Sequence, residues 1–395
     1  MGIIGPNSRM RSIPTTGGIR ELRALAEEME RQGRSILHFE IGEPDFSSPA
    51  CAKEAVAEAL KEGREHYSDN AGVPELRQAL AEKLSAQYGF PVDGEREIVI
   101  TLGATEAITL CMLSLFEFGD EIIVFSPMYP SFSDQIALAG LAMKVVHCSF
   151  DDGFGLPLEE LEGAVGPRTR GILVNSPSNP TGSVFTREEL GYLADFAKRH
   201  DLVVISDECY KDLIYDGEHR SISEFAGMRE RTAIVGAASK TYAMTGWRVG
   251  WVVVPAAFKK YAQKCHQILT THAATFVQYG VAAALRCADE DVVRMRDEYR
   301  KRRDTFVPLL AAIGGVEVHV PAGSMFLYPR FGGFGMSSME MCDYLLREAG
   351  VSTVPGEAFH SSEPCLRLSF GCPREQLTEG ARRIAEALAK LHSNR

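Results

Sequence analysis

The chain has 395 residues, of which 45% are hydrophobic and 24% are charged. It is too long for one ordinary domain and too apolar for a disordered chain, so we expect two domains. Forty-two basic against fifty-three acidic side chains give a net charge of −11. An acidic chain of this kind has no overall positive field to attract nucleic acid or anionic lipid, which argues against both classes of partner.

The sequence contains no segment that indicates export or membrane insertion. The first residues lack the continuous apolar stretch of a signal peptide, and the most apolar internal run, residues 249–257, is about half as long as a membrane-spanning helix. Nine cysteines, odd in number and without a C-x-x-C pair, favour reduced thiols over a disulfide framework or a zinc site. We therefore expect a cytoplasmic protein that binds no metal.

Residues 51–288 alternate helix-period segments with short β-branched runs. Alternation of this kind is typical of an α/β fold in which helices cover both faces of a mainly parallel sheet. The runs expected to form strands are residues 98–102, 121–125, 171–175, 202–206, 232–235 and 251–254. We expect this region to be the large domain.

Residues 289–395 predict a smaller α+β domain, which we expect the N-terminal segment, residues 1–50, to join. The expected elements are helices over 289–312, 338–349 and 373–392 and strands over 316–320, 325–331 and 365–370. Four consecutive basic residues, Arg300 to Arg303, lie in the first of these helices among acidic neighbours. That pattern is typical of a solvated helix face rather than of a binding patch.

Residues able to hold a ligand follow five of the predicted strands. Ligands of open α/β sheets bind beyond the carboxyl ends of the strands, where helix N-termini and loop side chains meet. In chain order these strand ends carry an anion-binding turn, an aromatic ring, an amide, a carboxylate and a lysine: Gly103-Ala104-Thr105, Tyr129, Asn179, Asp207 and Lys240. Each alone could be a cap, a turn or a surface residue. Together they predict a pocket for a ligand that has a phosphate, a flat ring and a group with which a lysine can react.

Several segments resemble the signature segments of one family. The longest are SPSNPTG at 176–182, DECY at 207–210 and SKTYAMTGWRVGW at 239–251, and shorter ones are IGEPDF at 41–46, HYSDNAGVPELR at 66–77 and LRLSF at 366–370. In these segments the chain closely resembles class I/II aminotransferases, pyridoxal-phosphate (PLP) enzymes of fold type I, in order and spacing over nearly its whole length. The resemblance implies a PLP cofactor and a homodimer with shared active sites.

The resemblance implies catalytic roles for Lys240, Asp207 and Tyr210. Lys240 corresponds to the lysine that holds the cofactor aldehyde as a Schiff base and then moves a proton as general acid and base. Asp207 corresponds to the carboxylate that keeps the pyridine nitrogen protonated. Tyr210 and Asn179 are expected to hydrogen-bond the ring O3′, and Tyr129 is expected to stack on the ring.

For the cofactor phosphate, the resemblance implies a turn, an arginine and a tyrosine from a second subunit: Gly103-Ala104-Thr105, Arg248 and Tyr67. The arginine supplies a planar fork that matches phosphate oxygens. Many relatives have a serine three residues before the lysine, where this chain has Ala237. We expect Ser239 to be the candidate replacement for the missing hydroxyl.

For the substrate, Arg367 corresponds to the arginine that clamps the α-carboxylate, assisted by Asn179 and the backbone of Gly42. This implies L-α-amino acids and 2-oxo acids as substrates. In one related aspartate-aminotransferase subgroup a lysine stands at the position of Thr105 and receives the distal carboxylate, and in another an arginine from the neighbouring subunit does so.

The preferred donor is expected to be neutral or aromatic rather than aspartate. Residues 270–276 contain no arginine, which leaves His272 as the only candidate cation there. An unpaired buried carboxylate is costly, so such a pocket disfavours a second acidic group. The residues expected to line the side-chain pocket are Ile19 and Met325, and those that could bind glutamate or 2-oxoglutarate as a common partner are Arg20 and His272.

Three functions are compatible with these observations. The first is an aminotransferase that works by a ping-pong mechanism, and the second is a lyase, decarboxylase or racemase that uses the same cofactor and pocket. The third is a non-catalytic transcription regulator, but the roughly 40 residues before the IGEPDF segment neither suffice for a DNA-binding domain nor carry a basic face. We expect a transaminase of EC 2.6.1 type, with the lyase as the alternative.

Overall fold

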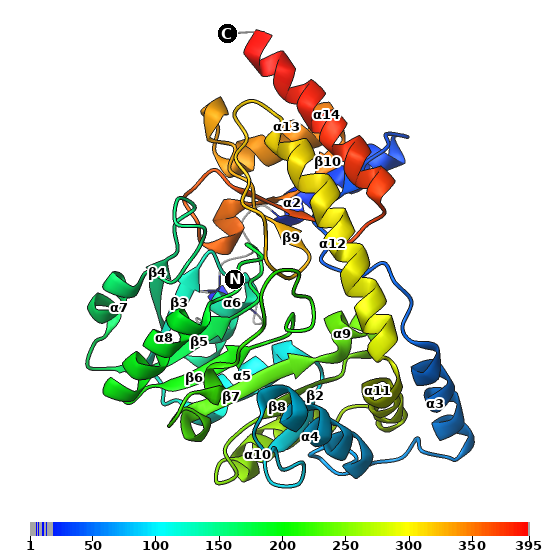
Figure 1. Cartoon of the computed structure of the whole chain (residues 1–395), viewed down its shortest axis with the longest axis vertical. Coiled ribbons are helices and arrows are strands. Elements are labelled where there is room, and N and C mark those ends of the chain that lie inside the picture. Colours follow the sequence, from blue (N-terminus) through cyan, green and yellow to red (C-terminus); the bar gives the residue numbers. More distant parts are fainter. Residues whose placement is uncertain (1–4, 6, 8–9, 12, 14–18, 394–395) are drawn as a thin grey trace.

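A computed structural model of the protein describes residues 5, 7, 10–11, 13 and 19–393, without the side chains of residues 19, 20, 392 and 393. Its centre is a seven-stranded sheet with the strand order β2-β8-β7-β6-β5-β3-β4. The strands are β2 (Ile98–Thr101), β3 (Glu121–Ser126), β4 (Ala142–His147), β5 (Thr169–Asn175), β6 (Val203–Asp207), β7 (Thr232–Ala237) and β8 (Gly250–Val253). Figure 1 shows this sheet in the lower half of the molecule.

Most neighbouring strands of this sheet are parallel, and β8 runs antiparallel to both β7 and β2. In β5, Ile172 and Val174 pack in one hydrophobic cluster, whereas Leu173 packs in another on the opposite face. Burial on both faces explains why the strands are continuous apolar runs. The parallel register places Asn175 beside Asp207 and Asp207 beside Val235, so the polar strand ends meet at one edge.

Helices cover both faces of the sheet. They are α3 (Ala50–Lys61), α4 (Pro74–Tyr88), α5 (Ala104–Leu115), α6 (Ser131–Ala139), α7 (Leu158–Ala164), α8 (Arg187–Arg199), α9 (Ala238–Thr241), α10 (Lys259–Thr270) and α11 (Thr275–Cys287). Helix α8 contributes to the cluster that contains Ile172, and α5 and α6 contribute to the cluster that contains Leu173. The fold class predicted from the sequence, α/β with a mainly parallel sheet, is confirmed.

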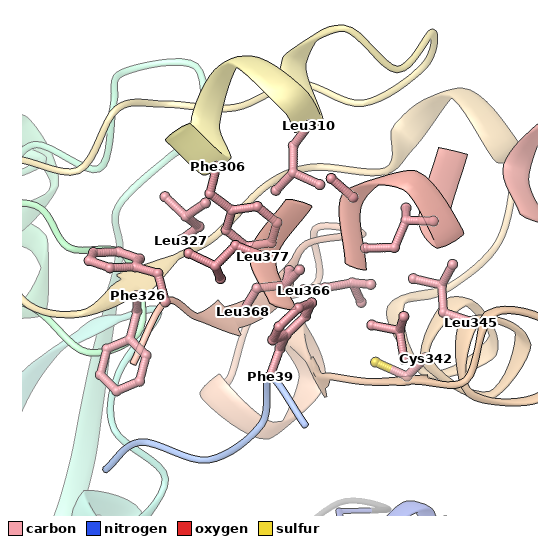
Figure 2. Packing of buried hydrophobic residues seen from close by; sticks show 14 of the residues in the cluster. Phe39, Phe306, Leu310, Phe326, Leu327, Cys342, Leu345, Leu366, Leu368 and Leu377 are labelled. Atoms are coloured by element: carbon pink, nitrogen blue, oxygen red, sulfur yellow. The ribbon is translucent and has the colours of Figure 1, made fainter. Parts of the chain in front are cut away.

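A second group of elements forms the upper half of Figure 1. It contains α2 (Ile19–Arg31), β1 (Leu37–His38), α12 (Asp289–Ala311), β9 (Phe326–Leu327), α13 (Ser338–Ala349), β10 (Val351–Ser352), β11 (Val354–Pro355), β12 (Leu366–Ser369) and α14 (Arg374–Ser393). Figure 2 shows Phe39 of the N-terminal segment among Phe306, Leu366 and Leu368 of the C-terminal region. This shared core supports the predicted domain boundaries, which stay a prediction.

The predicted strands of the large sheet agree with the observed ones to within one or two residues at their ends. The sequence analysis missed β4, whose residues are mostly half-buried and therefore lack a continuous apolar run. It was wrong about residues 316–320, where Glu317 forms only an isolated bridge with Arg330. Among the described residues no helix is both long and apolar enough to cross a membrane.

The expectation that all the cysteines are reduced is wrong for one pair. Cys51 in α3 and Cys287 at the end of α11 form a disulfide across a sequence separation of 236 residues, and the other seven cysteines are free. The two helices pack against each other, which brings together two residues whose spacing in the sequence gives no sign of contact. In the described part of the chain no group of three or more His, Cys, Asp or Glu side chains could hold a metal ion.

The basic cluster in α12 also differs from expectation. Arg302 and Arg303 are each only 5% exposed rather than solvated. Arg302 pairs with Asp45 and Arg303 pairs with Asp216, and both carboxylates lie far from α12 in the sequence. Helix α12 packs against segments from both halves of the molecule, and these segments bury Arg302 and Arg303. The acidic neighbours within the helix sequence therefore do not indicate a solvated face.

Candidate active site

A cavity of about 400 Å³ lies at the carboxyl ends of β3, β5, β6 and β7. Its wall is completed by the turn before α5, by β9 and β12, and by the segment around Gly42. Every residue predicted to bind the cofactor or the substrate α-carboxylate lines this cavity except Gly103 and Tyr67. The edge of the large sheet and the second half of the molecule together bring into one cavity residues as far apart in the sequence as Gly42 and Arg367.

Lys240 lies in α9, the short helix that follows β7 directly. Its Nζ donates a hydrogen bond of 2.5 Å to the carbonyl of Gly42. Burial lowers the pKa of Lys240 to about 8, aided by the positive charges of Arg367 and Arg248 and opposed by Cys209 and Glu43. At neutral pH a fraction of the amine is thus unprotonated and able to act as a nucleophile or base.

Asp207 is the last residue of β6 and is 6% exposed. Its carboxylate accepts hydrogen bonds from the Asn175 side chain at 3.1 Å and from the backbone amide of Cys209 at 3.2 Å. Burial raises the pKa of Asp207 to about 6. Within the described residues it forms no salt bridge, so this buried carboxylate can accept a cationic partner in the cavity.

The anion-binding turn and Arg248 lie against each other. Gly103 has φ +90° and precedes the first residue of α5, and a Cβ atom at Gly103 would come within 2.8 Å of the Arg248 guanidinium. Arg248 donates hydrogen bonds to the carbonyls of Thr245 at 2.9 Å and Leu102 at 3.2 Å. Gly103 thus takes part by leaving room for the arginine, and the free amides at the start of α5 face the same cavity.

Arg367 of β12 is buried between two phenyl rings, with its guanidinium carbon 4.5 Å from the Phe326 ring centroid and 5.3 Å from that of Phe359. It donates to Asn179 Oδ1 at 3.2 Å and to the carbonyl of Glu40 at 2.5 Å. Its Nε has no hydrogen-bond partner, and burial lowers its pKa to about 10. The side chain is therefore charged at neutral pH, fixed in place and short of one acceptor.

Tyr210 and Tyr129, the two aromatic residues predicted for the site, both line the cavity. Tyr210 is buried, which raises its pKa well above the usual range, and its ring makes an edge contact with Phe326. Tyr129 contacts Phe132 edge-on at 5.5 Å between ring centroids. Ser239 and Ala237 also reach the cavity, so the predicted replacement hydroxyl is near the position where the serine is missing.

Tyr67 lies outside the cavity and is 90% exposed. Its ring contacts that of His272, and His272 Nδ1 lies 2.7 Å from the carbonyl of Ala273. Neither residue lines the cavity within a single chain. Tyr67 is the residue that the sequence analysis expected to reach the cavity of a second subunit.

The structure adds residues that the sequence analysis missed. Phe326, Cys209, Thr245 and Gln135 line the cavity, and Phe326 takes the place that was expected for its neighbour Met325, which is fully buried elsewhere. Residues 325–331 read MFLYPRF, which has no alternation of apolar and polar residues, so their pattern does not indicate which side chain faces the site. The side chains of the other two predicted pocket residues, Ile19 and Arg20, lie outside the described part of the chain.

Comparisons with known proteins agree with this geometry. Residues 34–384 match the family model described as aminotransferase class I and II. The chain is 38% identical to aromatic-amino-acid aminotransferase 2 of Thermococcus litoralis, covering 94% of this chain and 95% of the relative, and 39% identical to an aspartate aminotransferase of Pyrococcus abyssi with the same coverage. The solved structure of Thermus thermophilus aspartate aminotransferase with maleate superposes with a TM-score of 0.92 at 34% identity, covering 98% of this chain and 100% of that one.

Fold and site together define a fold type I enzyme, with a lysine and a carboxylate at neighbouring strand ends and an arginine opposite them. The chain belongs to the class I and II aminotransferase family, and its enzymatic activity is amino-group transfer. These relatives give no support to the lyase alternative.

Proposed function

We propose that the protein uses PLP, held in the 400 Å³ cavity, to transfer an amino group between an L-α-amino acid and a 2-oxo acid by a ping-pong mechanism. The observation that carries the proposal is that Lys240, Asp207 and Arg367 line the same cavity. A buried Asp207 without a salt bridge among the described residues fits a cationic ring nitrogen, and Lys240 fits an aldehyde. When bound, PLP supplies an electron sink for the electrons released at the substrate Cα.

Each neighbouring side chain has a task in this proposal. Asp207 keeps the ring nitrogen protonated, and its own hydrogen bond from Asn175 fixes the direction of the carboxylate. Lys240 would hold the cofactor through its Nζ and would move a proton at the substrate Cα, first as general base and then as general acid. Tyr210 and Asn179 border the same space and would donate to the ring oxygen.

The phosphate would lie at the start of α5. Ala104 and Thr105 provide backbone amides at the helix N-terminus, and Arg248 provides a guanidinium beside them. Ser239 supplies a hydroxyl in place of the serine that is missing at Ala237. Backbone amides, a hydroxyl and a fixed positive charge together suit a dianionic phosphate.

The α-carboxylate of the substrate would bind Arg367. This arginine is already oriented by Asn179 and by the Glu40 carbonyl, and its unpartnered Nε and remaining N–H groups suit a carboxylate acceptor. Because the guanidinium is preorganised between two phenyl rings, little side-chain entropy is lost when the substrate binds.

The donor is proposed to be neutral or aromatic. The cations that line the cavity in the described part of the chain are Lys240, Arg248 and Arg367, and each already has a task. Thr105, where a related subgroup has a lysine, offers only a hydroxyl, and the Phe326 ring adds apolar surface. A second carboxylate would therefore lose hydration without gaining an ion pair.

The functional unit is proposed to be a homodimer with shared sites. Tyr67, Tyr261 and Ile268 are 90%, 54% and 72% exposed, and the last two lie on α10, which leads into residues 270–276. Exposed apolar side chains gathered on neighbouring segments are typical of an interface. Sedimentation of the holoenzyme should give a dimer, and a fully active monomer would contradict this part of the proposal.

The proposed location is the cytoplasm, with amino acids, 2-oxo acids and a second copy of the chain as partners. Seven of the nine cysteines are free, although the Cys51–Cys287 disulfide requires that an oxidised form persists at least in part. Fractionation of cells that produce the protein would test the compartment directly.

The experiment that tests the proposed function is a single half-reaction. The PLP-loaded protein is mixed with one amino acid and no acceptor, and the cofactor spectrum is recorded together with the 2-oxo acid formed. Transamination predicts stoichiometric conversion to the amine form of the cofactor and one 2-oxo acid per site. Continuous product formation with an unchanged spectrum would instead indicate lyase chemistry.

A further inference from the structure

Residues 40–48, the segment that leads from β1 to α3, contact both the lysine and the arginine of the site. The carbonyl of Glu40 accepts a hydrogen bond of 2.5 Å from Arg367 Nη2, and the carbonyl of Gly42 accepts one of 2.5 Å from Lys240 Nζ. Two main-chain oxygens only two residues apart therefore fix two side chains that come from opposite halves of the molecule. We call residues 40–48 the connecting segment.

The connecting segment also lies tightly against the aromatic ring that supports Arg367. A Cβ atom at Gly42 would come within 3.0 Å of Phe326, so the backbone packs directly on that ring. The same ring stacks on the Arg367 guanidinium at 4.5 Å. A shift of the connecting segment would thus change the position of Arg367 both through its hydrogen bond and through Phe326.

The connecting segment is anchored to α12 by one ion pair. Arg302 donates to both carboxylate oxygens of Asp45, at 2.8 and 3.0 Å. The Arg302 guanidinium carbon also lies 5.0 Å from the Phe46 ring centroid and 5.3 Å from that of Tyr299. The Arg302 side chain is 6% exposed and that of Asp45 is 30% exposed, so solvent screens this forked contact less than it screens a surface pair.

The two partners of this ion pair differ in the number of ion pairs that each forms. Arg302 has a second carboxylate, because its Nε lies 3.3 Å from Glu298 Oε1 on the same helix. For the Asp45 carboxylate, Arg302 provides the only ion pair within the described residues. Removing the charge of Asp45 would therefore leave Arg302 paired and α12 in place. The connecting segment would then be held by the packing of Phe46 on Tyr299 and by its hydrogen bonds with Ala243 and Thr245. Figure 1 shows α12 extending from beside α11 in the lower half of the molecule to α14 in the upper half, so α12 contacts elements of both halves.

We propose that Asp45 and Arg302 are positioning residues: their ion pair holds the connecting segment against α12 in the place where the Glu40 carbonyl orients Arg367 for the substrate. Neither side chain lines the cavity, so both act through the segment and not by touching the substrate. The inference rests on the proposed function, because it assigns Arg367 to the substrate carboxylate. It accounts for a buried arginine that the amino-transfer chemistry itself does not use.

The test compares Asp45→Asn with a matched control, Glu317→Gln. Glu317 also forms a forked ion pair, with Arg330 at 2.8 and 2.9 Å, and Arg330 likewise keeps a second carboxylate, that of Asp151. The control pair therefore has the same chemistry but does not touch the connecting segment. Asp45→Glu, which keeps a carboxylate, serves as the conservative variant.

Two measurements are made on each variant. In the half-reaction, we expect Asp45→Asn to raise the apparent dissociation constant of the amino donor roughly tenfold while the limiting rate changes by less than about threefold, since the substrate arginine is misplaced but the reacting groups are kept. Amide hydrogen exchange in residues 40–48 should accelerate roughly tenfold in Asp45→Asn, with or without PLP. Glu317→Gln should change neither quantity, and Asp45→Glu should recover part of the loss.

The proposal is overturned if the donor constant of Asp45→Asn stays within twofold of the wild type, if exchange in residues 40–48 is unchanged, or if Glu317→Gln shows the same losses. Should Asp45→Asn fail to fold, Arg302→Lys, which keeps the charge but loses the fork, is measured in the same way and carries the same expectations. A wild-type protein that transfers no amino group would refute the proposed function instead. The exchange measurement on the cofactor-free protein would still decide whether the ion pair fixes the segment.

Discussion

The proposed role of Arg367 leads to a quantitative prediction for the substitution Arg367→Lys. Lysine keeps the positive charge but cannot form a forked contact with a carboxylate or stack between Phe326 and Phe359. It also loses the hydrogen bonds by which Asn179 and the Glu40 carbonyl orient the arginine. The variant should therefore fold and bind PLP but bind amino acids weakly.

The size of the effect follows from the contacts that are lost. A hydrogen bond to a charged group contributes about 1.5–3 kcal/mol, and lysine replaces one of the two bonds of the fork. The lost stacking on the two rings adds about 0.5–2 kcal/mol, so the total of about 2–5 kcal/mol corresponds to a roughly 30- to 5000-fold lower kcat/KM for the donor. The effect should appear at any pH from 7 to 9, because Arg367 has a pKa of about 10 and stays charged in that range.

The assay compares a donor that has both the carboxylate and the amine with one analogue that keeps only the carboxylate and another that keeps only the amine. The rate of the half-reaction is measured with phenylalanine, and binding is measured for 3-phenylpropionate and for phenethylamine. Arg367→Lys should weaken binding of the two carboxylates and leave binding of the amine unchanged, whereas Arg330→Lys, a control outside the cavity, should affect none of them. Equal losses for the carboxylates and the amine would refute the assignment of Arg367, since they would indicate a general disturbance of the cavity.

Four further predictions concern the cavity and the disulfide. Burial raises the pKa of Asp207 from 3.8 to about 6 in the cofactor-free protein, so the stability that this group contributes below pH 3.8 is lost as the pH rises to about 6. Asp207→Asn should lack this loss. Thermal unfolding measured between those pH values should therefore show the stability of the variant rising relative to that of the wild type. PLP titration of the same variant should show an affinity at least about a hundredfold lower, because a buried ion pair has lost one partner, and unchanged affinity would argue against a pyridine contact. Alkylation of the unfolded protein without reductant should label seven thiols and with reductant nine, whereas nine in both cases would exclude the Cys51–Cys287 disulfide. In a panel of twenty amino acids, neutral or aromatic donors should give the fastest half-reaction. A tenfold faster half-reaction with aspartate than with any of them would show that a further cation, such as Arg20, lines the pocket.

Much of the site could be predicted because the carboxyl ends of parallel strands lie at the same edge of a sheet. Once the strands were recognised, the residues after them had to meet at one edge, which brought Asn179, Asp207 and Lys240 together. Arg367 was different: nothing in the local pattern of its strand indicates that β12 faces the cavity, and only the resemblance of LRLSF to the family pointed to it. The structure places it there through the packing of the second half of the molecule on the first.

The residues that the sequence analysis misjudged depend on contacts between distant segments. Arg302 was expected on a solvated face because its helix neighbours are charged. It is buried because the segment that contains Asp45, 257 positions earlier, packs against α12. Cys51 and Cys287 meet because α3 and α11 pack together. Phe326 faces the cavity and Met325 does not, because neighbouring residues of an extended segment point to opposite sides. An error of one residue therefore selects the wrong side chain. Periodicity and turn signals carry no information on any of these contacts.

The central claim, that Lys240 holds PLP in this cavity, is tested most directly by covalent trapping. The PLP-loaded protein is reduced with borohydride and digested, and the modified peptide is identified by mass spectrometry, with Lys240→Ala as the control. We predict one cofactor per chain, attached at Lys240, and none retained covalently in the control, even though the variant still binds PLP through Arg248 and the turn before α5. Attachment at a different lysine, or a fully loaded protein that gives no covalent product, would contradict the account.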